Sequence, residues 1–518
     1  MKIAWHMPTL RRTTCGLSIR ALALAKRLCL EHGHEITFVV DGSKTDIDGD
    51  RVEGMPLRRF SVSRHRPLHW CLQAGARRRA AESLVKRIDS DHDVMISCQP
   101  EIVAAYAAKQ NRRPVLYVCG GTTLLHDVSD RMRQASLSAL RRLPFALDRC
   151  WKHRNESRAF IAADAVVFDS DQTRDLTTAA YGLNTDRLHA IHGGVDDTRF
   201  MPPDAIARRA ARRRLGIADD GIVVVWTGRF SPEKNLGLLL RSLRHCRDMP
   251  DRVLLVGDGP TRHTLVKLAK ELRLERVVQF TGEQADVRPF LHAADVFAFP
   301  SRGESFGGAL AEAMSCELAC VALRPDGRGI RNANCEIIEH GRCGLLVDRP
   351  DPEAFASALD AMVSEADDRR RLGQAARRRA CERFTWAAGS RRLNKLVTAL
   401  ARSRLPIEDC GLPQVRTMGN VAHLLNPRTR ECVTMVEGSA GVPPAATVEG
   451  SAGVPPAATV EGSAGVPPAA TRHQQMGRIG HLTHPNYSVR PPPLEGAGHP
   501  AQVTETGAEK GFSAQRSS

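Results

Sequence analysis

Two short segments of the chain combine residue types that could bind a charged ligand. The first, W-T-G-R-F-S-P-E-K-N at 226–235, follows an apolar run and contains Gly228, Arg229 and Lys234. A glycine lets the chain turn sharply where a strand ends, and two cations beside a helix start suit a diphosphate. The Ser-Pro pair between them is typical of a helix N-terminus. The alternative is a capped helix that carries two surface cations.

The second segment, P-S-R-G-E-S-F-G-G-A-L-A-E-A, also follows an apolar run. Two carboxylates separated by seven residues, Glu304 and Glu312, flank the turn residues Phe306, Gly307 and Gly308. Glycines allow a ligand close to the backbone, whose N–H groups at a helix start can donate to it. A carboxylate can also accept hydrogen bonds from both hydroxyls of a sugar diol. The alternative is that Glu304 caps the following helix and that Glu312 is solvated.

Apolar runs that alternate with helical patterns must position both segments. Strands are expected at 2–5, 36–40, 94–98, 115–118, 165–168, 189–191, 222–226, 253–256, 277–280, 296–299 and 320–323. Strands that alternate with helices indicate a parallel sheet covered on both faces, with ligands at the carboxyl ends of the strands. The series restarts after Pro202 and Pro203, so we expect two α/β domains at 1–200 and 203–375. A last helix at 376–400 is expected to pack back on this core.

The chain changes character beyond Leu405. It holds three identical copies of V-E-G-S-A-G-V-P-P-A-A-T at 436–471. Glycine and a Pro-Pro pair in every copy oppose helix and sheet, and each copy has almost no large apolar side chain to bury. We therefore expect 406–518 to be a low-complexity, disordered tail and an inert extension.

The composition argues against several classes of protein. The chain has 518 residues, a net charge of +16 and 5% aromatic residues. Only 11 of its 74 basic residues are lysines, a skew typical of a GC-rich genome, so the charge alone does not indicate a nucleic-acid partner. No apolar run reaches the ~20 residues of a membrane span and no secretory signal is present, which favours the cytoplasm. The 14 cysteines form no C-x-x-C pair, so neither zinc nor a disulfide framework is expected.

The motifs resemble those of retaining glycosyltransferases of family 4, which have the GT-B fold. Six segments of the second half carry this resemblance in order: G-R-F-S-P-E-K-N, V-L-L-V-G-D-G-P, V-V-Q-F-T-G, A-A-D-V-F-A-F-P-S, E-S-F-G-G-A-L-A-E-A-M and E-I-I-E-H-G-R-C-G-L-L-V. The first half adds A-D-A-V-V-F-D-S and G-G-V-D-D-T-R-F, so the resemblance spans about 1–390. It implies two Rossmann-like domains whose parallel sheets face each other across a cleft, an acceptor-binding one followed by a nucleotide-sugar-binding one.

The resemblance implies a phosphate-binding role for several residues. Arg229 and Lys234, on the turn at Gly228, would bind the diphosphate and stabilise it as the leaving group. Gly16 sits where the family's N-terminal glycine loop approaches the donor phosphates. Positive charge organised in advance around a departing diphosphate is an effective way to lower such a barrier. The family usually needs no metal, so neither a metal nor a cofactor is expected.

The resemblance implies a sugar-binding role for the second segment. Glu312 would hold the ribose hydroxyls, and Glu304 would engage the donor sugar together with backbone N–H groups near Phe306, Gly307 and Gly308. We therefore expect a hexosyltransferase that uses a nucleoside-diphosphate sugar and a carbohydrate or lipid-linked acceptor. Cell-envelope or exopolysaccharide biosynthesis is the expected setting.

The first half departs from the family pattern at the acceptor side. A cysteine replaces the first glycine of the pair that ends at Gly16, and Cys119 and Gly120 stand where the family often has a His. His126 is the candidate substitute, although a single His is more often structural. Gly193 replaces the usual Asn before Gly-Val-Asp.

Two other functions fit parts of the sequence. A nucleotide-sugar 2-epimerase has a related architecture but lacks this combination of R-x4-K and E-x7-E. A non-catalytic protein that binds anionic surfaces would account for arginine clusters such as 77–79, which also favour peripheral contact of an enzyme with an anionic membrane. The D-x-D triplets at 46–48, 48–50 and 91–93 are interpreted as solvated turns rather than metal ligands.

Overall fold

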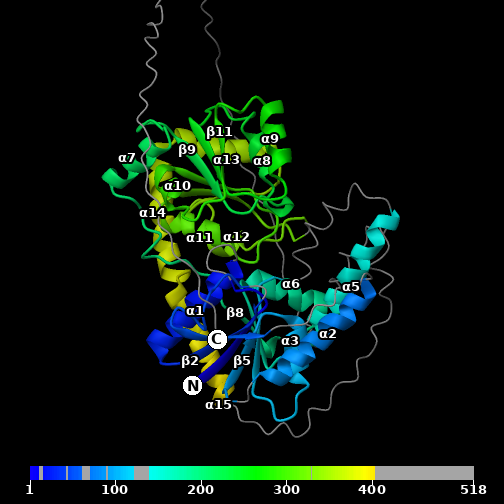
Figure 1. The fold of residues 1–518 in the computed structure, drawn as a ribbon. Helices are drawn as coiled ribbons and strands as arrows, with labels where there is room; N and C mark the ends of the chain where they lie inside the picture. Colours follow the sequence, from blue (N-terminus) through cyan, green and yellow to red (C-terminus); the bar gives the residue numbers. More distant parts are fainter. Residues whose placement is uncertain are drawn as a thin grey trace, which may run out of the picture. The chain divides into compact units, whose positions relative to one another are not determined.

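The computed structural model describes most of the first 402 residues (Figure 1). The described residues are 1–10, 16–42, 45–60, 70–88, 91–121, 139–327 and 329–402, with only the backbone given at 70–76 and 139–147. The expected tail at 406–518, with its repeats, lies outside the described residues. So does the acceptor-side candidate His126.

The N-terminal half forms an eight-stranded sheet in the order β3-β4-β2-β1-β5-β6-β7-β8. Its strands are β1 (Lys2–Met7), β2 (Glu35–Asp41), β3 (Arg51–Val52), β4 (Met55–Phe60), β5 (Val94–Ser97), β6 (Val115–Cys119), β7 (Ala165–Phe168) and β8 (Leu188–Ala190). All neighbours are parallel except β3 and β4, which are antiparallel. The carboxyl ends of β6, β7 and β8 therefore lie side by side.

The C-terminal half forms a six-stranded parallel sheet in the order β11-β10-β9-β12-β13-β14. Its strands are β9 (Val223–Thr227), β10 (Arg252–Val256), β11 (Val278–Gly282), β12 (Val296–Phe299), β13 (Ala319–Leu323) and β14 (Leu345–Val347). Two parallel sheets with intervening helices confirm the expected α/β fold class. Near-continuous burial along these strands is typical of parallel sheets that are covered on both faces.

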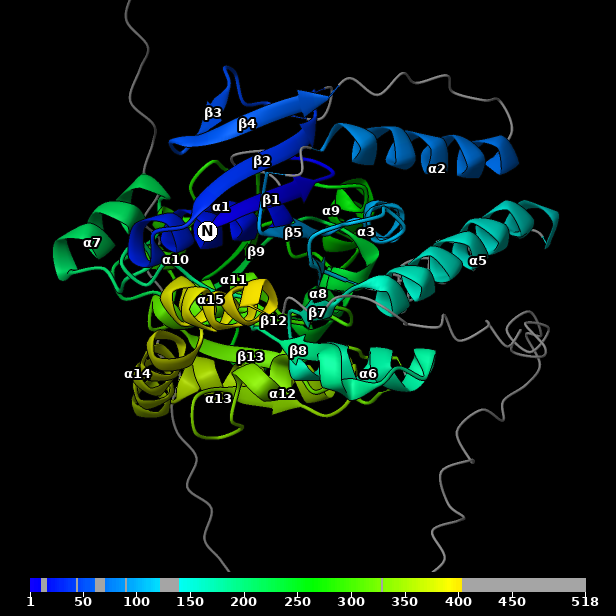
Figure 2. The same cartoon turned by 90° about the horizontal axis from the view of Figure 1, so that it is seen from below.

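Helices cover both faces of the N-terminal sheet (Figure 2). Buried residues of α1 and α15 share one apolar core with the sheet, and buried residues of α2, α3 and α5 share a second. The α-helices are α1 (Gly16–His32), α2 (Trp70–Arg87), α3 (Pro100–Ala107), α5 (Ala139–Ala162), α6 (Asp171–Tyr181), α7 (Ala205–Arg214), α8 (Leu236–Ser242), α9 (Arg262–Glu271), α10 (Arg288–Ala293), α11 (Gly308–Ser315), α12 (Asn334–Ile337), α13 (Pro352–Ser364), α14 (Ala366–Arg383) and α15 (Trp386–Arg402). In the described part of the chain, none of them is long and apolar enough to cross a membrane.

The single helix expected at 376–400 is wrong, because the chain forms α14 and α15 there. Phe384 O accepts a hydrogen bond from Val195 N–H over 2.8 Å, and Trp386 N–H donates to Val195 O over 3.2 Å. This bridge interrupts the helical hydrogen bonds. As a result α14 packs on the C-terminal half, against α11 and β13, whereas α15 packs on α1 of the N-terminal half.

Strand β4, which lies next to the two-residue edge strand β3, was missed by the sequence analysis, and its sequence explains why. M-P-L-R-R-F contains a proline and two arginines, which are poor strand signals. Only Met55 and Leu57 are buried, and β4 pairs in parallel with β2 through Leu57 and Phe60. The short β3 pairs only with Met55 and Pro56, so the rest of β4 lies at the edge of the sheet, where polar residues discourage pairing with other chains.

Helix α7 is anchored to the C-terminal sheet by the buried Arg212. Its guanidinium donates to four carbonyl oxygens, those of residues 218, 219, 221 and 293, and to Asp295 Oδ2 over 2.7 Å. Asp295, just before β12, also accepts from Val223 N–H at the start of β9. One side chain thus ties the helix to the two central strands of the sheet.

We predict that Arg212→Met destabilises the protein by about 3 kcal/mol, because buried carbonyls lose their donor and Asp295 loses a partner. The matched control is Arg213→Met, which removes an exposed cation from the same helix and should stay within about 0.5 kcal/mol. Urea unfolding followed by circular dichroism measures both. Equal losses in the two variants would contradict this account of Arg212.

Candidate active site

The two segments that the sequence singled out meet at the carboxyl ends of β9 and β12, which are neighbours in the sheet. Each strand runs directly into one segment. Arg302 N–H donates to Glu233 O over 2.8 Å, and Asn235 Nδ2 donates to Pro300 O over 3.2 Å. These hydrogen bonds join the two loops at one edge of the C-terminal sheet.

The turn at Gly228 is braced by the G-D-G-P segment that follows β10. A Cβ on Gly257, whose φ is +136°, would lie 1.8 Å from Gly228 O, so only glycine fits there. Gly228 N–H donates to Val256 O over 3.0 Å, and Phe230 N–H donates to Asp258 O over 2.8 Å. The turn that carries the candidate arginine is thus held by the neighbouring strand, and the arginine side chain is exposed.

Ser231 occupies the N-cap position ahead of Pro232, but it precedes a 3₁₀ turn rather than a helix and makes no capping hydrogen bond. Its side chain makes a short hydrogen bond with Glu233 instead of a backbone N–H, and a 3₁₀ turn spans Pro232–Lys234. Asn235 then adopts a left-handed conformation, with φ +54°, and α8 begins at Leu236. Asn adopts the left-handed backbone region more readily than most residues do. Asn235 can therefore separate the 3₁₀ turn from the start of α8.

Lys234 and Glu304 form the central ion pair of the site. Lys234 Nζ lies 2.6 Å from Glu304 Oε1, and both side chains are largely buried. The pair joins the first segment to the second through side chains as well as backbone. An ammonium group has three donors, so Lys234 can bind Glu304 and still offer hydrogens to an anion. The expected alternative in which Glu304 caps α11 does not occur, because Gly307 occupies the N-cap position.

Glu312 lies in the middle of α11, one turn beyond Gly308. Burial raises its pKa to about 7, and the charge of Arg199, from the linker after β8, partly opposes that rise. The carboxyl is therefore not a fully solvated one. A half-buried acid that titrates near neutral pH is typical of a functional site.

Phe306 connects this site to the N-terminal half of the chain. It is 4% exposed, and its ring lies edge-on against His192 and Phe384 with centroids 6.2 and 5.5 Å apart. A Cβ on Gly193 would lie 2.3 Å from Phe306 Cδ1. A side chain at 193 would therefore clash with the aromatic ring where it lies in this structure.

Gly16 and the acceptor-side positions lie on the other sheet. Gly16 begins α1, on the side of the N-terminal sheet, and a Cβ added there would meet no atom of the described residues within 4 Å. The cysteine before it lies outside the described residues. Cys119 ends β6 with its side chain buried, and burial raises the pKa of its thiol to about 12, so it is no nucleophile.

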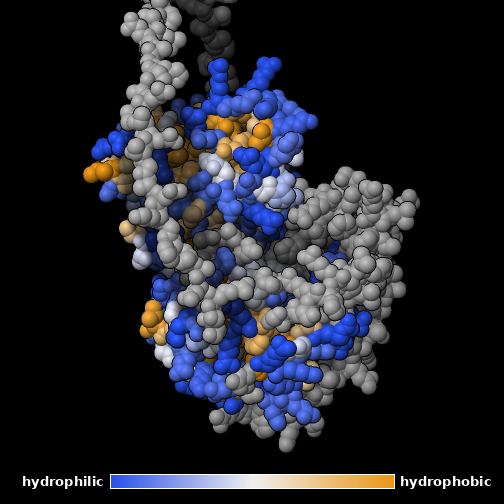
Figure 3. Space-filling model, viewed as in Figure 1, coloured by the Kyte–Doolittle hydropathy of each residue, from blue (hydrophilic) through white to orange (hydrophobic). Residues whose placement is uncertain are grey.

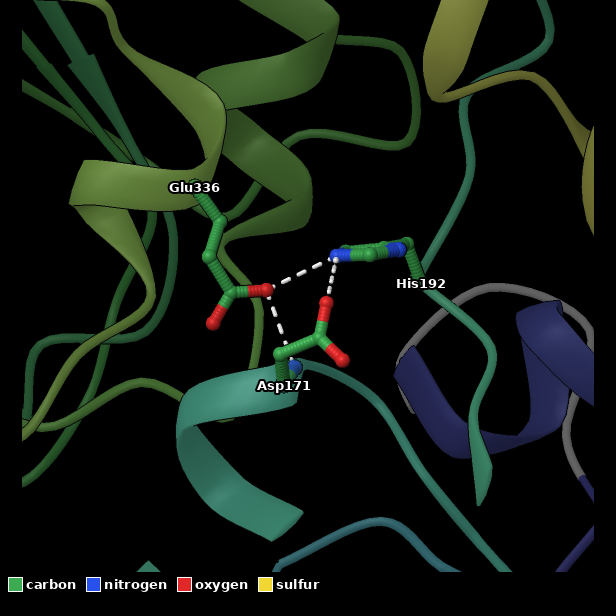
Figure 4. Close-up of side chains that lie close together, drawn as sticks. All are labelled: Asp171, His192 and Glu336. Carbon is green, nitrogen blue, oxygen red and sulfur yellow. Dashed lines mark hydrogen bonds and ion pairs between the residues drawn. The ribbon is translucent and has the colours of Figure 1, made fainter. Parts of the chain in front are cut away.

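A side-chain cluster that the sequence analysis missed joins the two halves near this site (Figure 4). The Glu336 carboxylate accepts from the N–H groups of Asp171 and Gln172, in the first turn of α6, over 2.9 and 2.6 Å. His192 Nε2 lies 2.7 Å from Glu336 Oε2, and Arg392 Nη1 lies 3.2 Å from His192 Nδ1. Burial opposes ionisation of Glu336, yet the hydrogen bonds from His192 and the two amides outweigh it and lower its pKa.

The hydrogen bonds assign this cluster a structural role. A guanidinium only donates, so His192 Nδ1 must accept from Arg392 and Nε2 must carry the hydrogen that goes to Glu336. One oxygen or nitrogen from each of Asp171, His192 and Glu336 lies within 4.8 Å of the others, a spacing that a metal could use. Both ring nitrogens and both Glu336 oxygens are already engaged, which favours a latch between the halves over a metal centre.

Comparison with known families matches both halves of the chain. Residues 15–199 match the model described as "Glycosyltransferase Family 4", and residues 207–379 match "Glycosyl transferases group 1". The boundary between the two matches falls at the linker before α7.

Curated relatives carry glycosyltransferase names. The chain is 30% identical to the GDP-mannose-dependent alpha-(1-6)-phosphatidylinositol monomannoside mannosyltransferase of Mycolicibacterium smegmatis over 339 residues, 62% of this chain and 81% of that protein. It is 34% identical over 242 residues to the D-inositol 3-phosphate glycosyltransferase of Xylanimonas cellulosilytica, 45% of this chain. The match spans about half of that relative, 56% of its length.

Solved structures share the fold. Sucrose-phosphate synthase from Thermosynechococcus elongatus matches with a TM-score of 0.63 and 19% identity, over 77% of this chain and 98% of that one. HepE from Anabaena, solved with UDP-glucose, matches with a TM-score of 0.59 and 19% identity, over 77% of this chain and all of that one. Together with the two family matches and the Mycolicibacterium relative, these structures show that the chain belongs to the family 4, group 1 glycosyltransferases and has their GT-B fold.

Proposed function

We propose that the protein is a retaining glycosyltransferase that moves a hexosyl group from a nucleoside-diphosphate sugar to a carbohydrate or lipid-linked acceptor. The observation that carries this proposal is the Lys234–Glu304 pair in the loops after two adjacent strands, with Arg229 in the same loop as Lys234 and Glu312 on α11. These groups offer cations for a diphosphate and carboxylates for sugar hydroxyls within one region.

The chemistry follows from these groups. As the bond between the sugar and the diphosphate breaks, negative charge grows on the diphosphate oxygens. Arg229 and Lys234 would stabilise that charge, and Lys234 would keep one hydrogen bond to Glu304, which holds its ammonium group in place. Since the cations are part of the protein, we expect transfer to proceed without an added metal and without a cofactor. Gly307 and Gly308 would leave the backbone N–H groups at the start of α11 open to the donor.

The comparisons support the donor and acceptor classes. The Mycolicibacterium relative is named for a GDP-mannose donor and a phosphatidylinositol mannoside acceptor, and HepE was solved with UDP-glucose. WaaG, a fold relative at 16% identity and a TM-score of 0.59, is titled as involved in lipopolysaccharide biosynthesis. We propose a nucleotide-sugar donor and a role in cell-envelope or exopolysaccharide biosynthesis at the cytoplasmic face of the membrane.

A cationic patch on α2 and α5 supports peripheral contact with an anionic membrane. Arg77, Arg78 and Arg79 are exposed on α2, and Arg154 and Arg158 are exposed on α5. Partial burial lowers the pKa of Arg158, and the positive charges of Arg154 and Arg78 lower it further. In Figure 3 the coloured residues where α2 lies in Figure 1 are mostly hydrophilic.

The first prediction of this proposal concerns the two cations. Arg229→Ala combined with Lys234→Ala should reduce glycosyl transfer about a thousandfold, because the leaving diphosphate loses its counter-charge. The donor is first found by thermal shift with UDP-, GDP- and ADP-sugars, since a bound ligand raises the melting temperature. Lys267→Ala combined with Lys270→Ala, exposed cations on α9, is the matched control and should transfer normally.

Three results would tell against the proposal. Unchanged transfer in the Arg229/Lys234 variant would remove the roles assigned here. A change of the sugar in the nucleotide without use of any acceptor would favour a 2-epimerase. Loss of transfer in EDTA would contradict the expectation that no metal is needed.

The second prediction is a pH dependence of donor binding. Ribose hydroxyls donate to a carboxylate, so protonation of Glu312 weakens the contact. With its pKa raised to about 7, affinity should fall as pH drops from 8 to 6, by up to about tenfold per pH unit below 7. Calorimetry with the nucleotide-sugar identified above measures this, because such diesters do not titrate in that range. Glu312→Gln should bind weakly and independently of pH; a profile as steep as that of the wild type would exclude Glu312.

The third prediction concerns the patch on α2 and α5. The protein should sediment with phosphatidylglycerol vesicles at low salt and be released as salt screens the charges. Arg78→Glu combined with Arg158→Glu should weaken this binding at least about tenfold. Lys267→Glu combined with Lys270→Glu makes the same charge change on α9 and serves as control. Equal weakening in both variants would show that net charge, not this patch, is responsible.

A further inference from the structure

Asp169, directly after β7, links the N-terminal sheet to the 304–308 loop of the C-terminal half. We propose that Asp169 is a positioning residue, which holds this loop through Ser305 and so aligns the donor for transfer. The inference rests on the proposed function for its catalytic consequence. The hold on the loop is a property of the structure that can be measured without it.

Ser305 is held from the N-terminal half at two points. Its Oγ donates to Asp169 Oδ2 over 3.1 Å, and its carbonyl oxygen accepts from Thr173 Oγ1, on α6, over 3.2 Å. The residues on either side are Glu304, which pairs with Lys234, and Phe306, which packs between the halves. A shift of Ser305 would therefore move both the ion pair and the aromatic contact.

A buried cation fixes the direction of the Asp169 carboxylate. Arg20 of α1 forms an ion pair with Asp169 Oδ1, and their side chains are only 7% and 11% exposed. Arg20 Nη2 also donates to Ile191 O, after β8, over 2.9 Å. With one oxygen on Arg20, the other is directed at Ser305. The contacts from Arg20 through Asp169 to Ser305 thus join α1, the first helix of the N-terminal half, to the candidate donor site.

Asp169 also lies beside the position where the family often has its acceptor-side His. A Cβ on Gly120 would meet Leu17 Cδ1 at 2.9 Å and Asp169 Oδ2 at 3.9 Å. Leu17 leaves no room for a side chain at 120, and the Cys119 side chain is buried. Among the described residues, the carboxylate of Asp169 is the polar side chain next to that position, in contact with the 304–308 loop.

The test separates the hold on the loop from the reaction. In Ser305→Ala, which leaves the Arg20–Asp169 pair intact, hydrogen–deuterium exchange in 304–308 of the full chain should accelerate about tenfold, since one hydrogen bond to a charged acceptor is lost. Ser305→Thr keeps the hydroxyl and should restore slow exchange. Ser357→Ala, which removes an exposed hydroxyl from α13, is the matched control and should exchange like the wild type.

Kinetics then test the positioning role. In Ser305→Ala, kcat for transfer should fall about tenfold while the dissociation constant for UDP or GDP stays within about twofold, because the diphosphate contacts remain. Asp169→Asn should do the same and should also lower the melting temperature, because Arg20 loses its buried counter-ion.

Each outcome decides the matter. Unchanged exchange in both variants overturns the inference, whatever the kinetics show. Faster exchange with unchanged kcat overturns the positioning role. A wild-type protein that transfers from no nucleotide-sugar refutes the proposed function, and exchange at 304–308 then still decides whether Asp169 holds the loop.

Discussion

The arrangement of the site depends on one constraint, the adjacency of β9 and β12 in a parallel sheet. Parallel strands end at the same edge, so the loops that follow them must share space there. The chain uses this space to bring Lys234 within 2.6 Å of Glu304. Neighbouring strands lie only about 4.8 Å apart, so the two loops begin close to each other. Gly257 and Gly259, in the loop after β10, pack closely against the backbone of the turn that carries Arg229.

The two cations at this edge differ in their surroundings, because Lys234 is largely buried in an ion pair and Arg229 is exposed. Lys234 is neutralised by Glu304, and desolvation disfavours the ionised form of Glu312. Without Glu304, the largely buried Lys234 would be a buried charge with no partner, which is destabilising. The ion pair with Glu304 holds the Lys234 ammonium group in a fixed position, so the group is already in place when an anion binds. Arg229 is exposed on its turn, so its side chain is the one that can adjust its position to the ligand.

The sequence predicted the parts of this site that depend on local order along the chain. Apolar runs located β9 and β12, and the glycines and charged residues after them identified both segments. The sequence did not predict the backbone conformation of the first segment. Ser231 and Pro232 have the composition of a helix start, yet Asn235 interrupts the helix and a 3₁₀ turn forms instead. That outcome depends on the backbone of the neighbouring loop, which sequence spacing does not encode.

Contacts between the halves were beyond prediction for a different reason. Glu336 was part of a quoted motif, but nothing in its neighbours indicates that it would cap a helix whose first residue is 165 positions earlier. Likewise, Gly193 was noted as a departure from the family, and only the structure shows Phe306 in the space that a side chain would need. Such pairings depend on how the two halves pack against each other, and local sequence patterns do not indicate that packing.

The contacts between the halves are of two kinds, and the difference has a consequence for how the site works. Glu336 and His192 form a polar latch in which both ring nitrogens and both carboxylate oxygens are engaged, and the latch contacts the 304–308 loop through the edge-on packing of His192 against Phe306. Ser305, by contrast, is a neighbour of Glu304, and its partner Asp169 is fixed by a buried arginine. The latch can therefore hold the halves together, whereas the Asp169 contact controls where the 304–308 loop lies once they are joined. Rigid placement of such a loop matters more for the rate of a transfer than for the affinity of the donor, because small errors of alignment raise the barrier steeply.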